Sequence, residues 1–353
     1  MTYRPVLWLA LALLAAPGWA WADGSAYVPV LTDAAAWKNL PPAEEGAGQP
    51  LPTWIRALAG PLPKTAAAMI ELDYVQRVES TLPPRLRAKL RWMIADANRC
   101  EYAKAYARLD YVRAGGKPEE IDELPRRLDQ LPEAERLALQ FVRQLAEAAY
   151  TVTDAQVARV VKLHGEKQIV AIVLVAAYAN FQDRLLLALG VPVEPNGPLP
   201  PVKVRFRKPP APAKSPPPEK DKPDVKEKDK EPPKRNLTPP AKNPPPVPTK
   251  VDDPEWTAFP YETLQERLAG QKDRRQARIP IPDWKAVREN LPEGMPRDKP
   301  IRIRWNLINY GYQPRLNAAW IGGLRAFRQE SDLDVVQQES MFWVVTRSLH
   351  CFY

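Results

Sequence analysis

A chain of 353 residues with 45% hydrophobic content can bury more than one core, so its length suggests two domains. The formal net charge is +9, yet residues 203–250 alone hold 14 Lys or Arg against 6 Asp or Glu and account for +8. The basic excess therefore lies in one segment and not on a folded face, so we expect no nucleic-acid partner.

The first 22 residues have the pattern of a secretory signal peptide. Arg4 supplies a positive start, Val6 to Ala16 form an apolar stretch too short to span a bilayer, and Ala20-Trp21-Ala22 is a small-x-small cleavage site. We expect a secreted or periplasmic protein with no membrane span in the mature chain. An uncleaved membrane anchor is the alternative.

After a lead-in over residues 23–50, a first domain is predicted over residues 51–198, helical nearly throughout. No stretch of useful length alternates with period two. The expected fold class is therefore all-α, a bundle of antiparallel helices. Four helices are expected in this domain. The first begins at Pro83-Pro84, the second runs from Pro132 to Tyr150, the third begins after a cap at Thr153 or Asp154, and the fourth runs from Glu166 to Leu189 and ends at Gly190.

Residues 199–255 are predicted to be a disordered Pro/Lys-rich linker. Of the 42 prolines in the chain, 19 lie between Pro198 and Pro254, mixed with Lys and Glu. Such a mixture keeps a tether extended and soluble. Attachment to an acidic surface or envelope polymer is the alternative for this segment.

A shift of 251 residues without a gap aligns the sequence with itself. Over residues 63–102 the shift gives eleven identities in forty positions and pairs the only two cysteines, Cys100 and Cys351. Chance does not keep one offset over such a distance, so we interpret the chain as a tandem duplication, with the second copy over residues 256–353. The same shift pairs Pro63 with Pro314, Arg77 with Arg328, Glu79 with Glu330, Ser80 with Ser331 and Trp92 with Trp343.

Two stretches of the first copy carry a family resemblance. An apolar helix ends in Asn98-Arg99-Cys100-Glu101-Tyr102, and the later stretch Tyr178-Ala179-Asn180-Phe181-Gln182-Asp183-Arg184 is followed by Leu189-Gly190-Val191-Pro192-Val193-Glu194-Pro195. Together they resemble the active-site helix, final helix and tail of the alkyl hydroperoxidase D-like (carboxymuconolactone decarboxylase-like) family. The resemblance covers residues 51–198 and, through the repeat, the last hundred residues.

The resemblance implies a thiol site with the pattern Cys-x-x-Cys-x-x-x-His and a Glu twelve positions before the first Cys. One cysteine attacks a peroxide or disulfide, the other resolves the product, and Glu and His relay protons. The first copy keeps only Cys100, because Ala88, Ala103 and Ala107 stand at the other three positions. We therefore expect a degenerate first site in which Cys100 is an inert or structural thiol.

The second copy keeps more of the pattern. Glu339 stands twelve positions before Cys351, so these two are the candidate catalytic residues. His350 adjoins Cys351 but is not at the family's His position, and we expect it to modulate the site at most. His164 is predicted to lie in a loop. No metal-ligand spacing or phosphate-binding loop occurs in the sequence, so we expect no metal and no cofactor.

Three functions remain open. The leading one is an exported thiol-dependent peroxidase of the peroxiredoxin type, or a disulfide reductase, acting through Cys351 on a peroxide or disulfide with a thiol electron donor. A non-catalytic helical scaffold or binding protein of the cell envelope is the second. A structural disulfide between Cys100 and Cys351 is the third. The family resemblance also implies assembly into homo-oligomers.

The second copy is expected to be incomplete at its C-terminus. The first copy continues for about ninety residues after Cys100, whereas the second copy ends two residues after Cys351. We expect the residue after Tyr353 to be a cysteine, which would complete the Cys-x-x-Cys pattern.

Export is expected to remove the first 22 residues and leave Asp23 as the new N-terminus, because Ala20 and Ala22 meet the requirement of signal peptidase for small residues. Intact-mass analysis of the protein from the producing cell checks this cleavage. A mass that includes Met1 would contradict it.

Overall fold

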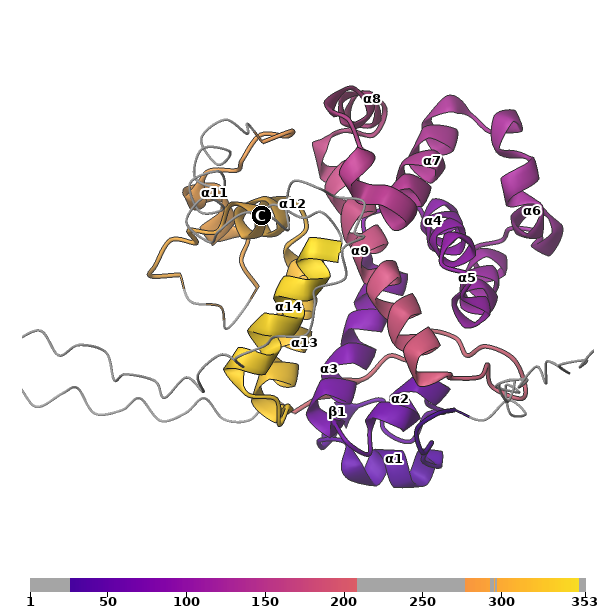
Figure 1. The fold of residues 1–353 in the computed structure, drawn as a ribbon, viewed down its shortest axis with the longest axis vertical. Helices are drawn as coiled ribbons and strands as arrows, with labels where there is room; N and C mark the ends of the chain where they lie inside the picture. Colours follow the sequence, from indigo (N-terminus) through magenta and orange to yellow (C-terminus); the bar gives the residue numbers. More distant parts are fainter. Residues whose placement is uncertain (1–25, 208–276, 293–294, 296, 349–353) are drawn as a thin grey trace, which may run out of the picture. The chain divides into compact units, whose positions relative to one another are not determined.

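The computed structural model of the chain describes residues 26–207, 277–292, 295 and 297–348, which are mostly helical (Figure 1). The expected all-α class is confirmed, with the addition of one antiparallel pair of short strands, β1 (Ala43–Glu45) and β2 (Arg205–Phe206). The predicted signal peptide and most of the predicted linker lie outside the described residues.

Several predicted helix ends coincide with those of the structure. The side chain of Thr153 accepts a hydrogen bond from the Gln156 amide and caps α8, and Gly190 adopts the left-handed conformation (φ 60°) at the end of α9. The helices of the first copy are α1 (Asp33–Asn39), α2 (Thr53–Leu58), α3 (Pro63–Tyr74) with the π-helical turn η1 (Val75–Glu79), α4 (Pro84–Ala97), α5 (Glu101–Arg113), α6 (Pro118–Asp122), α7 (Glu133–Ala148), α8 (Asp154–His164) and α9 (Glu166–Leu189).

Two apolar clusters meet along α4 and α9. One lies among α4, α7, α8 and α9, and the other lies among α1, α2, α3, α5 and the chain that follows α9. Among the described residues, α9 is the helix long and apolar enough to cross a membrane, but 72% of its most apolar stretch is buried inside the protein. The core helix of a folded domain can be equally long and apolar, so the length and composition of α9 are weak evidence for a membrane span.

Residues 199–207 belong to the packed structure and not to the predicted linker. Val202, Val204 and Phe206 are buried, whereas the residues between them are exposed. This period-two pattern follows from β2, which pairs with β1 and packs Phe206 near Trp37 at a ring distance of 6.2 Å. Residues 199–207, which the sequence led us to assign to the linker, are therefore described as part of the packed structure, and the alternating stretch in them is short.

The helices of the second copy begin at positions equivalent to those of the first. Under the 251-residue shift, each start coincides with the start of α1, α2, α3 or α4, and α13 spans the equivalents of both α3 and η1. The buried residues Val287, Leu291 and Tyr310 likewise correspond to buried Ala36, Leu40 and Ala59. The four helices are α11 (Trp284–Glu289), α12 (Arg304–Tyr312), α13 (Pro314–Glu330) and α14 (Val335–Ser348).

The described residues of both copies form one compact unit, although the sequence predicts two separate bundles. α13 packs along α3 and η1, and α12 packs on α9 (Figure 1). Polar contacts support this packing: Tyr312 donates to Glu166 at 2.9 Å, and Gln313 donates to the Lys167 carbonyl at 2.7 Å. Among the described residues of the second copy the separate core is small, and this packing supplies much of their buried surface.

The helix α14 is less covered than α4, its equivalent in the first copy. α4 lies among α5, α7 and α9, and most of its side chains are buried. Along α14, by contrast, the apolar side chains of Met341, Phe342 and Val344 are between 56% and 65% exposed.

We predict that Phe206→Ala lowers the free energy of unfolding by about 3 kcal/mol, because the ring fills a core position beside β1. Urea denaturation of the full chain measures the change. Arg207→Ala is the control, since this exposed neighbour should alter stability by less than about 0.5 kcal/mol. Equal effects of the two substitutions would show that 199–207 does not contribute to the core.

Candidate functional site

Cys100 lies in the tight turn between α4 and α5. Its amide donates to the Ala95 carbonyl at 2.8 Å, and the preceding Arg99 adopts a positive φ of 56°, a conformation that is uncommon outside glycine. The turn directs the thiol into the protein, where Cys100 is 1% exposed. Burial raises the pKa of the thiol to about 12, and the carboxyl group of Asp183 adds to this rise. Cys100 is therefore a neutral thiol at physiological pH and a poor nucleophile.

The three alanines predicted to replace the family's site residues are all buried. Ala88 on α4 and Ala107 on α5 lie in the apolar cluster with α7 and α9, and Ala103 lies in the other cluster with Cys100. The structure thus places methyl groups where a proton relay would need Glu and His. No acid–base partner for the thiol comes from these positions.

Asp183 on α9 is a buried carboxyl group whose charge acts on the Cys100 thiol. The sequence alone did not identify it as a candidate site residue. Its Oδ2 accepts a hydrogen bond of 2.9 Å from Asn98, which also donates to Asn180. Burial raises the pKa of Asp183 to about 6, even though the hydrogen bond from Asn98 and the charge of Arg91 oppose the rise. A carboxylate beside Cys100 disfavours the thiolate, so this pair does not activate the sulfur.

A buried charged network lies between α3, α4, α5 and α9. Asp73 accepts hydrogen bonds from Tyr178 at 2.8 Å and from Arg77 at 3.2 Å, and Arg91 lies 3.6 Å away. Arg77 also binds both carboxylate oxygens of Asp110 on α5, at 2.7 and 2.8 Å. Burial alone would raise the pKa of Asp73, but the two guanidinium groups outweigh it and hold the pKa below its usual value. The network is structural, because its charges are paired with one another.

A second buried cluster joins α5 to the segment after α9. Tyr102 donates to Glu194 Oε1 at 2.7 Å, and the Tyr102 ring stacks on Tyr106 at 4.7 Å. The same Glu194 oxygen accepts from the Thr53 amide at the start of α2, at 2.8 Å. This carboxylate anchors the family-like tail to α2 and α5. Glu194 is part of the stretch that carries the family resemblance, but its sequence position predicted no role for it.

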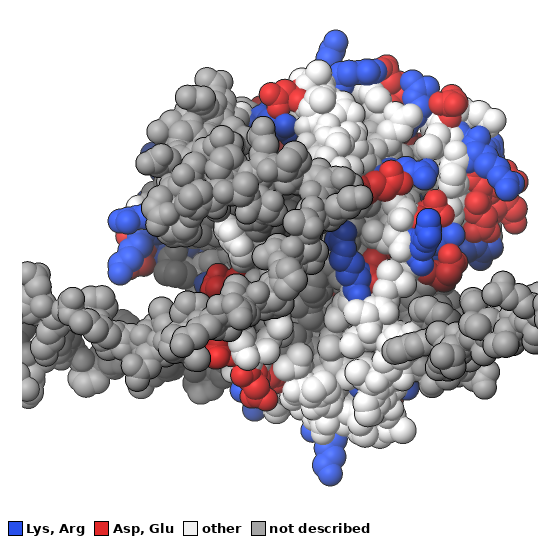
Figure 2. Space-filling view, viewed as in Figure 1, with Lys and Arg blue, Asp and Glu red and all other residues white. Residues whose placement is uncertain are grey.

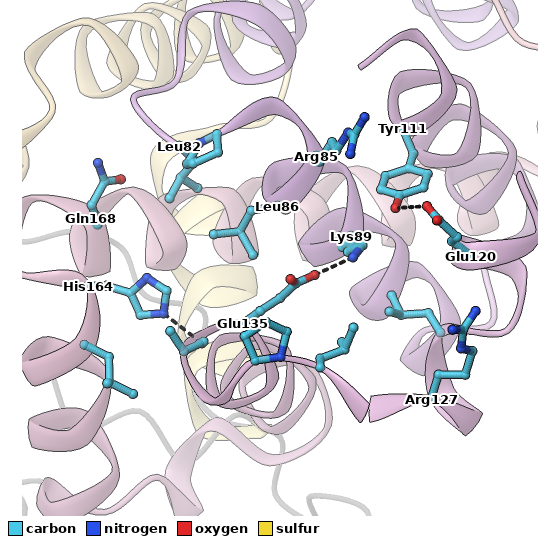
Figure 3. A pocket seen from close by; sticks show the side chains of 16 residues that line it. Leu82, Arg85, Leu86, Lys89, Tyr111, Glu120, Arg127, Glu135, His164 and Gln168 are labelled. Atoms are coloured by element: carbon cyan, nitrogen blue, oxygen red, sulfur yellow. Dashed lines mark hydrogen bonds and ion pairs between the residues drawn. The ribbon is translucent and has the colours of Figure 1, made fainter. Parts of the chain in front are cut away.

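A cavity of about 700 Å³ lies away from Cys100, between α4, α6, α7 and α8 (Figure 3). Several of its polar side chains are paired: Lys89 with Glu135 at 2.5 Å, Tyr111 with Glu120 at 2.7 Å, and His164 with the Ala134 carbonyl at 2.9 Å. The buried side-chain oxygen of Gln168 has no hydrogen-bond partner among the described residues. His164 is the last residue of α8, so its predicted loop position was wrong by one residue. None of the positions implied by the family site lines this cavity.

In the second copy, the structure describes only one of the predicted site residues. Glu339 is on α14, with its side chain 63% exposed, and one of its oxygens lies 4.0 Å from Arg328 on α13. Cys351 and His350 lie outside the described residues, so no contact can be assigned to them. Within the described parts of the chain, no group of three or more His, Cys, Asp or Glu side chains could hold a metal ion.

No protein-family model matches the chain, and no curated protein matches its sequence. The functional argument therefore depends on the residues themselves. On the surface shown in Figure 2, positive and negative side chains are interspersed over the helices α6 to α8. The basic excess of the sequence lies over residues 203–250, most of which are outside the described residues.

We predict that Asp183→Asn raises the free energy of unfolding by about 3 kcal/mol at pH 8 and has little effect near pH 3.5. The folded carboxyl holds its proton up to about pH 6, whereas an unfolded one releases it near 3.8, so the group's destabilising effect grows as pH rises through this window. Urea titrations at both pH values measure it. Glu101→Gln, at an 80% exposed side chain, is the control. Equal effects of Asp183→Asn at both pH values would contradict the shift.

Proposed function

We propose that the first copy is a non-catalytic helical scaffold of the alkyl hydroperoxidase D-like type, and that it holds the second copy of an exported protein. The observation that supports this function best is the state of Cys100. The thiol is buried, its pKa is raised to about 12, and the three expected partner positions are alanines packed into the core. A thiol of this kind supports packing and not redox chemistry.

The second candidate is thiol-dependent peroxidase or disulfide reductase activity through Cys351. In its favour, α14 begins at the residue equivalent to the start of α4, so Glu339 lies on the helix that leads towards Cys351. In this proposal the Cys351 thiolate attacks a peroxide oxygen, an alcohol or water leaves, and the sulfur becomes a sulfenic acid. An external thiol then condenses with the sulfenic acid to a mixed disulfide and releases water. A second external thiolate attacks that disulfide, frees the Cys351 thiolate and leaves as the oxidised external disulfide.

The two candidate functions concern different copies: the scaffold role belongs to the first copy and the thiol activity to the second. Scaffold residues lie in the first copy, and any reacting sulfur lies in the second. The alternative of a structural Cys100–Cys351 disulfide requires Cys100, which is 1% exposed, to reach a second sulfur. Export to an oxidising compartment, predicted from the signal sequence, would permit either a disulfide or a peroxide substrate.

We predict that Cys100→Ala changes any peroxide turnover of the full chain by less than about twofold, whereas Cys351→Ala lowers it at least about a hundredfold. Peroxide consumption with dithiothreitol as reductant measures both. In the native protein Cys100 should react with a thiol reagent only after denaturation. Activity that depends on Cys100 would refute the scaffold role. A complete lack of turnover in the unmodified chain would remove the second candidate.

A further inference from the structure

The contact between the two copies joins equivalent helices. α3 with η1 packs against α13, and the 251-residue shift places Pro63, the start of α3, on Pro314, the start of α13. The two helices run antiparallel, since the first turn of each lies beside the end of the other: Lys64 contacts Glu330, and Arg315 contacts Glu79. Under the shift, Lys64 corresponds to Arg315 and Glu79 to Glu330.

These two end contacts are related by an approximate two-fold axis. The Glu330 carboxylate accepts from the amides of Lys64 at 2.9 Å and Thr65 at 2.7 Å. Amides in the first turn of a helix have no acceptor within the helix, so Glu330 satisfies donors that α3 itself cannot. At the other end, Glu79 forms an ion pair of 2.6 Å with the Arg315 side chain. Glu79 and Glu330, which are equivalent under the shift, thus each bind the first turn of the opposite helix.

The centre of the contact differs between the copies. Gly323 of α13 corresponds to Leu72 of α3, and a Cβ added at Gly323 would lie 2.8 Å from Met69 Cε. Met69 and Leu72 of α3 fill the space that the missing side chain leaves. The preceding residue, Gly322, faces nothing within 4 Å. A leucine at position 323, as in the first copy, would therefore meet the end of the flexible Met69 side chain, which would have to shift, and its outer carbons would also extend from a Cβ only 4.0 Å from Leu72.

Aromatic packing beside this centre belongs to the same contact. Trp320 of α13, which corresponds to Met69, packs edge-on against Phe181 of α9 at a ring distance of 5.7 Å. Trp320 also packs against the apolar cluster that contains Met69 and Leu72. The second copy therefore seals the α3 surface of the first copy with its own equivalent helix.

We propose that α3 and η1 form a docking surface whose partner is the equivalent helix of the second copy, related by an internal two-fold axis, and that Gly323 makes this surface accept the second copy and not another first copy. A pair of two α3 helices would place Leu72 where Gly323 now lies. In an isologous contact the same surface of two copies pairs with itself. A single substitution at the symmetry axis of such a contact can therefore make it favour an unlike partner over an identical one. This inference rests on the contacts between helices and is independent of the thiol chemistry.

Hydrogen exchange of the full chain, read by mass spectrometry in peptides covering residues 62–69, tests the docking. Protection of the Lys64 and Thr65 amides comes from Glu330 across the contact. We expect Gly323→Leu to speed exchange there at least about tenfold, with α4 and α9 unchanged. Gly322→Leu is the matched control and should leave exchange within about twofold of the unmodified chain.

A second variant separates steric undocking from unfolding. Met69→Ala combined with Gly323→Leu removes the atom that the new side chain meets, so protection of residues 62–69 should return to near its original level. Glu330→Gln should speed exchange in the same peptides without disturbing α9. Unchanged exchange in Gly323→Leu, an equal effect of Gly322→Leu, or no recovery in the double variant would each overturn the proposal.

Discussion

The carboxylate of Asp73 lies buried between the guanidinium groups of Arg77 and Arg91, and this arrangement joins six segments of the first copy: α3, η1, α4, α5, α9 and the chain after α9. Arg77 extends from η1 to Asp110 on α5 and donates to the Leu199 carbonyl after α9. Tyr178 and Gln182 bring α9 to the same carboxylate. Removing one member of such a network leaves an unpaired buried charge, which typically costs about 3–5 kcal/mol. The network therefore fixes how α3, α4, α5 and α9 meet.

The second copy lacks this centre, which explains its dependence on the first. Leu324 stands at the position of Asp73 and is 42% exposed, and Arg328, the equivalent of Arg77, reaches out to Glu339. The described part of the second copy holds no buried ion pair and only a small core, and α13 obtains its burial from α3. The same helix position is thus a structural centre in one copy and a surface in the other.

Sequence patterns predicted the elements whose signals are local. Proline and Thr153 at helix starts and Gly190 at a helix end are read within one turn of the chain. The structure adds that the 251-residue shift aligns the starts of the four helices of the second copy with those of α1 to α4. The β1–β2 pair was missed, because its partners are about 160 residues apart and each strand is too short for a pattern. An i, i+4 spacing of Asp73 and Arg77 is also ordinary on an exposed helix, so nothing in the sequence showed that the pair is buried.

From the sequence we could predict which expected site residues are replaced around Cys100, but not which residues lie near it in the fold. Alanines at three of the four positions implied by the resemblance led us to expect an inert or structural Cys100, and the structure adds that this residue is buried. The effect of Asp183 could not be foreseen, because 83 residues separate it from Cys100 and only folding brings its charge close enough to act on the thiol. Likewise, the docking of α13 on α3 depends on Gly323 facing Met69, a relation between copies that no comparison within either copy reveals.

Ala88 and Ala107 contribute to the close packing of the first copy. A carboxylate at position 88 and an imidazole at position 107 would lie in an apolar cluster, where polar groups without partners are costly. Alanine at both positions lets α4 and α5 pack closely around the core instead. Glu339, the equivalent of Ala88, avoids that cost because α14 holds it at the surface beside Arg328. The same helical position is thus an apolar core position on α4 and an exposed, charged position on α14.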